Sequence, residues 1–495
     1  MTYLKENDNT PTVELEPTDA QPTPLAASHD PNTPPALVEF MLQGWAERSD
    51  EAGPPIRHVE AFRARRKKLS AQYPGEVIII PTGHEKVRSN DTHFRFRPAS
   101  DFYYLTGNTE PDCVLMLIPN QDGGHEEILW VEPSNRTDAT FFTDRAKGEL
   151  WAGPRLGVTK SQWYFGVNQC ASLRDIDGFV EKLQSDPQLS VRLLRGFDEK
   201  LDTTFAVREA DGELATFLSE TRLIKEEIEI EELQSAIEST HRGFEDVIKR
   251  LAIAHSEREV EGVFNLRARV EGNDVGYGTI AASGHHACVL HWVQNDGKLQ
   301  RGDLLLLDAG VEAHSLYTAD ITRTLPISGK FSETQRTIYD LVYKAQRAGL
   351  AAVRPETDFM EPNRVAQRVL AEGLYELGIL KTTPDEALKE EHQFQRRYSL
   401  HNVSHMLGLD VHDCAKARQE NYKFGKLKSG MVLTVEPGLY FQKDDLTVPE
   451  AYRGIGIRIE DDVLVTESGY RNLSANIPTS ADEVEQWMER VWQDR

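Results

Sequence analysis

The order of apolar and polar residues along the 495-residue chain predicts two regions of different architecture. In the first region, four short apolar runs are bounded by Gly, Pro or acidic residues, which is typical of buried strands. They are EVIIIPTG (76–83), DFYYLTG (101–107), DCVLMLIP (112–119) and EEILWVEP (126–133). A helix is predicted before them in HVEAFRARRKKLSAQYPG (58–75), which ends at Pro-Gly. We therefore expect an α/β domain here.

The second region opens with a long amphipathic helix, predicted over 221–252, at the junction of the two regions. A further helix is expected over 332–353, and strands are expected at DLLLLDAG (303–310), MVLTVEPGLYF (431–441) and IGIRIEDDVLVT (455–466). Ser480 and Glu483 form a predicted capping box for a terminal helix. The apolar stripe of that helix, which predicts docking onto the core, consists of Val484, Trp487, Met488 and Val491.

These patterns predict an α+β protein with several parts, since 495 residues exceed one ordinary core. Residues 1–33 are rich in Pro, Thr, Asp and Glu, which predicts a disordered tail. A helical extension over 34–55 places Leu37, Phe40, Met41 and Trp45 on one face. The remaining predicted parts are an N-terminal domain over 56–220, a C-terminal domain over 221–480 and a terminal helix over 481–495.

Composition narrows the functional class. The formal net charge is −24, with 80 acidic against 56 basic residues, which disfavours a nucleic-acid groove or an anionic membrane surface. The four cysteines are scattered without a CxxC pair, which disfavours a thiolate zinc site and fits a reducing compartment. No signal peptide and no apolar run of about 20 residues is found. We therefore expect a soluble cytoplasmic protein.

Candidate chemistry begins with Glu460, which shares one face of a predicted buried strand with Arg458. An unpaired ion there costs several kcal/mol, so the carboxylate needs a partner. A plain ion pair with Arg458 is one explanation. Asp308, Asp320 and Glu436 also lie beside apolar runs, where a single acid is usually a turn cap or a solvated loop residue.

Taken together, these four acids and a histidine match the ligand set of a two-metal hydrolase. His401 and His405 have the spacing of a zinc-binding HExxH helix, but Asn402 stands where its glutamate is required. An oxygen-rich set favours Mn²⁺, Fe²⁺ or Co²⁺ over metals that prefer thiolate. Bound cations would also offset the cost of burying several acids.

The motifs LLLLDAG, TADITRTLP, HNVSHMLGLDVHD, LTVEPGLY and GIGIRIEDD, in this order between residues 277 and 466, resemble the signature of the M24B "pita-bread" metallopeptidases. Within that family they are most similar to the Xaa-Pro aminopeptidases. The stretch RSNDTHFRFRPASDFYYLTGNTEPDCVLML resembles the family's creatinase-like N-terminal domain. The resemblance implies a pita-bread catalytic domain behind an α/β creatinase-like domain.

The resemblance also implies residue roles. The metal ligands would be Asp308, Asp320, His405, Glu436 and Glu460, holding two divalent ions, expected to be Mn²⁺. Glu436 would also take up the proton of the attacking water. His291 and His412 would stabilise the tetrahedral intermediate, and His401 would line the proline pocket. Tyr277 and Arg458 would support the ligands, Tyr277 beside substrate. Asp91 and Trp151 would shape the subsite for the substrate's N-terminus.

The implied activity is release of the N-terminal residue from peptides with proline at the second position. Proline's imide lacks a hydrogen, so a specialised pocket is chemically sensible. A prolidase, which cleaves only Xaa-Pro dipeptides, shares the metal ligands and is the alternative. A non-catalytic pita-bread peptide-binding module or a metal-free creatinase-like hydrolase is disfavoured, because the ligand set is complete. The resemblance implies a homodimer or homotetramer, and no nucleic-acid or membrane partner is expected.

Overall fold

The computed structural model describes residues 33–46, 53–90, 92–134 and 136–494 and divides into two compact units, Met1–Leu214 and Ala215–Arg495. The disordered tail predicted for 1–33 lies outside the described residues, apart from residue 33. Helix α1 (Pro35–Met41) is shorter than the predicted extension. Trp45 lies beyond it and packs edge-on against Phe141, with ring centroids 5.7 Å apart.

A five-stranded mixed sheet forms the centre of the N-terminal unit, in the order β6-β5-β4-β1-β7. Its central strands pair antiparallel, whereas both outer strands pair in parallel. The strands are β1 (Val77–Pro81), β4 (Val114–Pro119), β5 (His125–Val131), β6 (Gln169–Ser172) and β7 (Val191–Leu193). Three of the predicted strands are thereby confirmed.

Helices cover this sheet and complete the core of the N-terminal unit. Phe179, Val180 and Leu183 of α7 join strand residues such as Met116 and Trp130 in one apolar cluster. The helices of this unit are α2 (Val59–Gln72), α3 (Ser100–Thr106), α4 (Thr140–Thr143), α5 (Glu149–Ala152), α6 (Gly157–Phe165), α7 (Ile176–Ser185), α8 (Glu199–Thr204) and α9 (Glu209–Thr221), which continues across the unit boundary. A small hairpin joins β2 (Val87–Ser89) and β3 (Thr92–His93).

The predicted strand over 101–107 is wrong, because this segment forms helix α3 (Ser100–Thr106). Five consecutive residues, 102–106, are buried, so the helix shows no polar stripe. A short apolar run of this kind has no periodicity that distinguishes helix from strand. The chain leaves the helix through Gly107, whose φ of 69° is a left-handed conformation that glycine adopts without strain.

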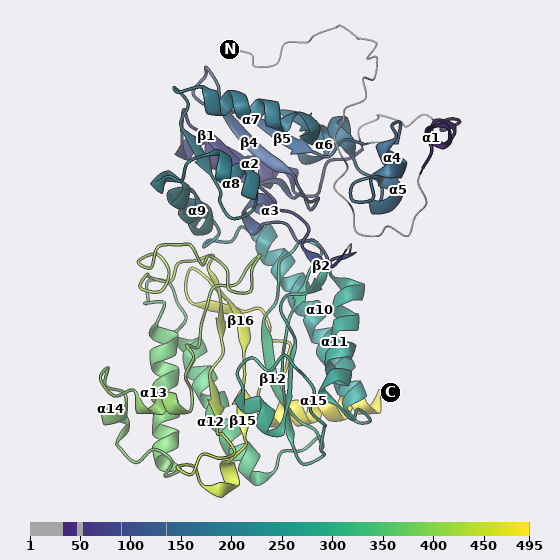
Figure 1. The fold of residues 1–495 in the computed structure, drawn as a ribbon. Helices are drawn as coiled ribbons and strands as arrows, with labels where there is room; N and C mark the ends of the chain where they lie inside the picture. The colour runs from purple at the N-terminus through teal and green to yellow at the C-terminus, as the bar shows by residue number, and fades with distance from the viewer. Residues whose placement is uncertain (1–32, 47–52, 91, 135, 495) are drawn as a thin grey trace. The chain divides into compact units, whose positions relative to one another are not determined.

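The C-terminal unit places small sheets between two pairs of helices, as Figure 1 shows. Helices α10 (Glu227–Leu251) and α11 (Glu257–Glu271) pack together on one side, and α12 (Glu333–Ala352) and α13 (Glu361–Glu376) on the other. The larger sheets have the strand orders β12-β10-β9 and β13-β16-β17, and the two-stranded sheets are β14-β15 and β11-β8. This is the arrangement expected of a pita-bread domain.

The strands of the C-terminal unit are short and mostly buried. They are β8 (Asp274–Val275), β9 (Ile280–Ser283), β10 (Leu304–Ala309), β11 (Val311–Glu312), β12 (Ile321–Pro326), β13 (Val432–Val435), β14 (Gly438–Tyr440), β15 (Gly456–Arg458), β16 (Asp461–Val465) and β17 (Tyr470–Asn472). Further helical segments are η2 (Gly284–Cys288), α14 (Pro384–Ala387), η3 (Phe394–Arg397), η4 (Glu450–Tyr452) and α15 (Ala481–Gln493). The predicted capping box at Ser480 and Glu483 is confirmed at the start of α15.

Three predicted elements of this unit have bounds that differ from the prediction. The strand predicted over 431–441 is divided into β13 and β14, which belong to different sheets. The helix predicted over 221–252 begins only at Glu227, because the Glu229 side chain accepts from the Glu226 backbone N–H and caps a new helix there. The strand predicted over 455–466 is two strands, since β15 pairs with β14 whereas β16 pairs with β13 and β17. Ile459 and Glu460 lie between them, so the chain changes sheets at Glu460.

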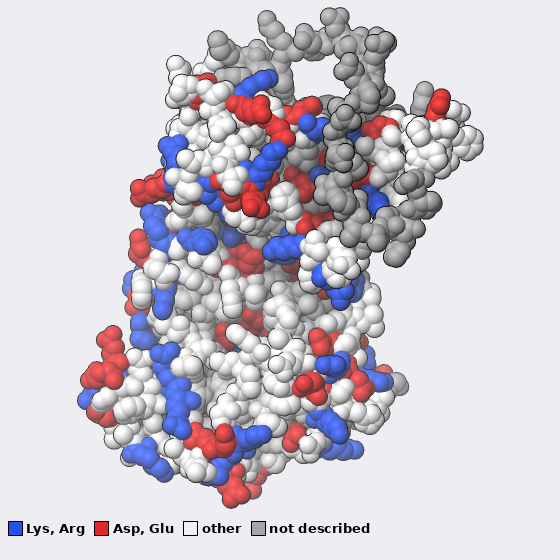
Figure 2. Space-filling model, viewed as in Figure 1, with Lys and Arg blue, Asp and Glu red and all other residues white. Residues whose placement is uncertain are grey.

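Charged side chains are interspersed on the face of the molecule that Figure 2 shows, with acidic and basic groups side by side. Among the described residues, no helix combines the length and the apolar character needed to cross a bilayer.

Candidate metal centre

The strand register brings the five predicted ligands to one place in the C-terminal unit. Asp308 lies near the end of β10, opposite Thr322 of β12, and Asp320 immediately precedes β12. Because β10 and β12 are antiparallel, the end of β10 lies beside the start of β12, and both acids lie at the same end of this strand pair. The backbone N–H of Glu460 donates to the carbonyl of Thr322 at 3.2 Å and so holds Glu460 at this end.

The other two ligands approach along β13. The backbone N–H of Thr434 donates to the His405 carbonyl at 3.0 Å, and that of Glu436 donates to the Val403 carbonyl at 2.9 Å. These bonds align the irregular segment around residue 405 with the end of β13. His401 and His405 lie outside any helix, so they do not form a zincin-type pair on one helical face.

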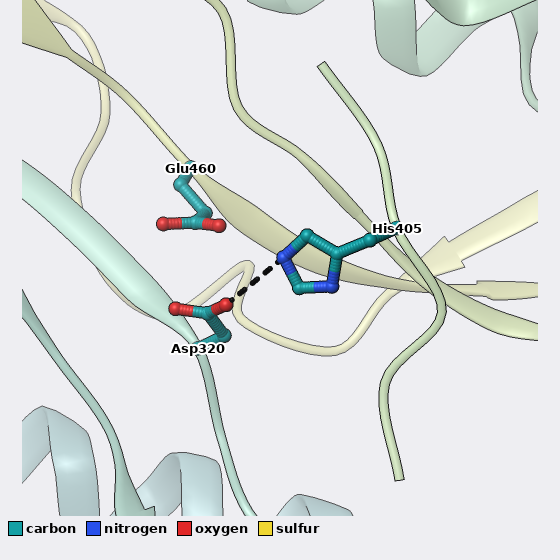
Figure 3. Close-up of side chains that lie close together, drawn as sticks. All are labelled: Asp320, His405 and Glu460. Carbon is teal, nitrogen blue, oxygen red and sulfur yellow. Dashed lines mark ion pairs between the residues drawn. The ribbon is translucent and has the colours of Figure 1, made fainter. Parts of the chain in front are cut away.

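Asp320, His405 and Glu460 form the centre of the cluster (Figure 3), with one ligand atom of each within 4.8 Å of the others. His405 Nε2 lies 3.2 Å from Asp320 Oδ2 and 3.6 Å from Glu436 Oε1. The Tyr277 hydroxyl lies 2.6 Å from Asp308 Oδ1 and 2.5 Å from Asp320 Oδ1, and so links the fifth ligand to the others. Glu436 thus contacts the central three residues directly, through His405, and Asp308 is linked to them through Tyr277.

Burial and mutual repulsion make this cluster electrostatically unfavourable without cations. Burial, and then the charges of Asp320, Glu436 and Asp308, raise the pKa of Glu460 well above its usual value. Burial also raises the pKa of Glu436 to about 7, and it raises the pKa of Asp308. For His405, burial lowers the pKa, but the hydrogen bond to Asp320 and the nearby carboxylates outweigh it, and the pKa rises to about 9.

This donor set fits divalent metal ions. Three buried carboxylates, Asp308, Asp320 and Glu460, and the half-buried Glu436 face the charges of Arg458 and a protonated His405, so additional positive charge is favourable. Carboxylate oxygens with a single imidazole suit hard or borderline divalent ions. The residues present can therefore hold such ions, as the family of the resemblance requires.

Arg458 is connected to the cluster through three hydrogen bonds, one of them to Asp308. Its Nη2 donates to Asp308 Oδ2 at 2.5 Å, its Nε to Thr322 Oγ1 at 3.1 Å and its Nη1 to the Tyr440 hydroxyl at 2.9 Å. Thr322 in turn donates to Glu460 Oε2 at 2.6 Å. The pairing of Arg458 with Glu460 suggested by the strand pattern is thus replaced by this network.

Thr322 and Tyr440 are hydrogen-bonded to candidate site residues, and the sequence analysis missed both. Thr322 follows Asp320 by two positions on a strand, where side chains share a face, and that spacing could have identified it. Tyr440 lies in the motif LTVEPGLY, and its hydroxyl is 2.7 Å from His401 Nε2. No local signal reveals that contact, because the two residues are 39 positions apart.

The three predicted substrate histidines also lie around the cluster. The His412 ring packs edge-on against His405, with centroids 4.4 Å apart, and His401 Nδ1 lies 3.6 Å from Glu436 Oε2. Burial, with the charge of Arg458, lowers the pKa of His401 to about 4, so this imidazole is neutral at pH 7. His291 is exposed and near enough for its charge to lower the pKa values of His401 and His412.

Two predicted site residues belong to the N-terminal unit. Asp91 lies outside the described residues. Trp151 is in α5, with 45% of its surface exposed. Its Nε1 donates to the Phe142 carbonyl at 2.8 Å, and the Arg145 guanidinium lies 4.9 Å from its ring. Their roles toward substrate stay predictions.

A buried ion cluster anchors the segment that carries His405 and His412. Lys225 and Arg222, between α9 and α10, donate to opposite oxygens of Asp413 at 3.1 and 3.0 Å. Burial raises the pKa of Asp413, but these two charges outweigh it and lower the pKa to about 2. Asp413 therefore contributes stability above its unfolded pKa of 3.8, and that stability is lost as the pH falls toward 2.

Replacing Lys225 by methionine should lower the free energy of unfolding by about 2–3 kcal/mol at pH 7, because a buried carboxylate loses one of its two cations. Urea denaturation of both proteins measures the difference, which should shrink below pH 4 as Asp413 protonates. Lys428→Met, at an exposed lysine, is the matched control and should change the value by less than about 0.5 kcal/mol. Equal losses in the two variants would contradict the prediction.

Comparisons with known proteins cover both units. Residues 231–467 match the sequence profile of metallopeptidase family M24, and residues 62–191 match that of the aminopeptidase P N-terminal domain. The chain is 52% identical over 463 residues to Xaa-Pro aminopeptidase 1 of Streptomyces coelicolor, covering 92% of this chain and 93% of that protein. It is 36% identical over 442 residues to Xaa-Pro aminopeptidase of Escherichia coli, covering 87% and 97%.

The solved structures give the same result. Aminopeptidase P from E. coli with the inhibitor Pro-Leu aligns with a TM-score of 0.80 and 33% identity, over 88% of this chain and 99% of that one. Both the pita-bread fold and the resemblance stated from the motifs are confirmed. The chain belongs to the Xaa-Pro aminopeptidases of metallopeptidase family M24.

Proposed function

We propose that this protein is a metal-dependent aminopeptidase that releases the N-terminal residue from peptides with proline at the second position. The observation that carries the proposal is the largely buried cluster of four carboxylates and His405, whose acids need divalent cations to be stable together. The similarity to Xaa-Pro aminopeptidases over most of the chain supports the choice of substrate.

We assign the metal ligands as Asp308, Asp320, His405, Glu436 and Glu460, holding two ions. Divalent cations bound there supply Lewis-acid chemistry, which polarises a peptide carbonyl and acidifies a water molecule. Mn²⁺ is the ion we propose, because the donor set is rich in oxygen.

The chain's own residues supply proton transfer and positioning. Glu436 takes up the proton of the attacking water, and His291 and His412 donate hydrogen bonds to the oxygen that becomes negative. His401, neutral and held by the Tyr440 hydroxyl, lines the pocket for the proline ring. Tyr277 and Arg458 fix the orientation of Asp308.

We propose a domain boundary near residue 220, supported by the division into units at Leu214 and Ala215 and by the two separate family matches. A cytoplasmic location is supported by four unpaired cysteines, three of them buried. The homodimer or homotetramer implied by the resemblance stays a prediction, which light scattering of the purified protein tests.

The function is tested by reconstituting the protein with Mn²⁺ and offering a tripeptide Xaa-Pro-Yaa beside the dipeptide Xaa-Pro. We expect release of Xaa and Pro-Yaa from the tripeptide, identified by mass, and no activity after the metal is removed with a chelator. Cleavage of the dipeptide alone would overturn the proposal in favour of a prolidase. Two bound metals with no cleavage of either peptide would favour a peptide-binding module.

A further inference from the structure

Glu257 is a fully buried carboxylate whose two oxygens take part in four hydrogen bonds. It is remote in sequence from every metal-binding motif. It is the first residue of α11, and its exposed fraction is 0%. Such an ion is stable only when its oxygens are fully hydrogen-bonded. Its four partners all lie in the segment 283–297, which begins at the end of β9, includes η2 and ends a few residues before β10.

The four partners are spread along that segment. Glu257 Oε1 accepts from the Ser283 backbone N–H at 2.7 Å and lies 2.8 Å from His286 Nδ1. Oε2 accepts from Trp292 Nε1 at 2.8 Å and from the Gly297 backbone N–H at 2.7 Å. One carboxylate therefore connects both ends of the segment to its middle.

Packing around Glu257 makes this connection rigid. The rings of His286 and Trp292 are stacked, with centroids 3.9 Å apart. A Cβ at Gly297 would lie 2.7 Å from the Glu257 carboxylate, so the backbone there can approach the acid only because residue 297 is glycine. The buried Asn295 side chain donates to the Thr279 carbonyl at 2.8 Å and fixes the same end of the segment.

His291 lies inside this segment, directly before Trp292. Among the described residues no hydrogen bond is formed to its imidazole, and the residue is exposed. Its position therefore depends on the backbone on either side, which the Glu257 contacts hold. The proposed function makes this imidazole a hydrogen-bond donor to the scissile carbonyl, so the rate depends on where the segment holds it.

We propose that Glu257 is a positioning residue that holds His291 in place for substrate through Trp292 and the backbone of Ser283 and Gly297. The proposal rests on the proposed peptidase function and deepens it. It assigns to an acid outside the ligand set the role of fixing a hydrogen-bond donor for the scissile carbonyl, where displacement by about 1 Å can cost on the order of 100-fold in rate.

A double-mutant cycle tests whether Glu257 acts through His291. Glu257→Gln keeps the shape of the side chain, but its NH₂ must face at least one backbone N–H. We expect kcat/KM for Xaa-Pro-Yaa to fall about 10- to 100-fold with two metals still bound. In a His291→Ala background the same substitution should cost less than about 3-fold, because the group it positions is gone.

Trp292→Phe is the milder second variant, since it keeps the ring beside His286 and removes only the Nε1–H donor. We expect a 3- to 10-fold loss alone and less than 2-fold beside His291→Ala. If Glu257→Gln does not fold, this cycle decides the proposal. Glu259→Gln, on the same helix and bonded to Arg250 instead, is the control and should leave kcat/KM within 2-fold of wild type.

Equal losses with and without His291 would overturn the proposal, and so would loss of metal from Glu257→Gln with activity recovered in excess Mn²⁺. Neither outcome would affect the proposed function while the wild-type protein cleaves the tripeptide. An inactive, fully metallated wild-type protein would instead refute the proposed function itself. The two failures are therefore distinguishable.

Discussion

Replacing Glu460 by alanine should lower kcat/KM for an Xaa-Pro-Yaa peptide at least about 1,000-fold and reduce the metal content below two ions per chain. Glu460 lies at the centre of the cluster with Asp320 and His405, where the chain passes from β15 to β16. Lewis-acid activation lowers the activation barrier by several kcal/mol, and each 1.36 kcal/mol lost is about tenfold in rate. Initial-rate kinetics and elemental analysis measure both quantities.

The matched control is Glu467→Ala, which removes an exposed acid from the turn after β16. It should leave metal content and kcat/KM within about 2-fold of wild type. If Glu460→Ala kept two ions and full activity, Glu460 would not be a metal ligand.

Without metal, removing the charge of Glu460 should stabilise the fold. Glu460→Gln keeps an acceptor for the Thr322 hydroxyl but removes an acid whose pKa is raised in the folded state. Such an acid destabilises the fold at pH values above its unfolded pKa, and the penalty disappears as the pH falls below that value. In chelator at pH 7 the variant should therefore unfold at a higher urea concentration than wild type, whereas with Mn²⁺ wild type should be the more stable.

Replacing Arg458 by methionine should have the second-largest effect, lowering kcat/KM about 100-fold. The guanidinium donates to Asp308, Thr322 and Tyr440, and removing it leaves Asp308 without its only ion-pair partner among the described residues. Groups that orient metal ligands typically contribute 10- to 100-fold to metal affinity or activity. Metal titration and kinetics of the variant measure the loss.

Stability should also fall in the metal-free Arg458→Met protein, by about 3 kcal/mol, because a buried carboxylate loses its cation. Arg458→Lys should give intermediate activity, since one ammonium group cannot reproduce three hydrogen bonds in a fixed plane. Arg471→Met on β17, an exposed arginine, is the control and should resemble wild type. Wild-type activity in Arg458→Met would show that Asp308 needs no orienting partner.

Local sequence signals predicted most elements of the fold correctly. The Pro-Gly stop after α2, the capping box of α15 and the apolar runs of β1, β4 and β10 each depend on neighbours only a few positions away. The same locality explains the error at 101–107. Burial on all sides of α3 comes from distant residues, and it erased the periodicity by which a helix is recognised.

The sequence by itself determined which ligand types are present, their order along the chain and, through the motifs, the family. Only the tertiary structure decided that the strand predicted over 455–466 is interrupted at Glu460 and that Arg458 binds Asp308. It also decided that Glu257 holds both ends of the segment carrying His291. These contacts join residues up to 150 positions apart. Strand register and burial create them, whereas a periodic pattern reports only which side of its own element a residue faces.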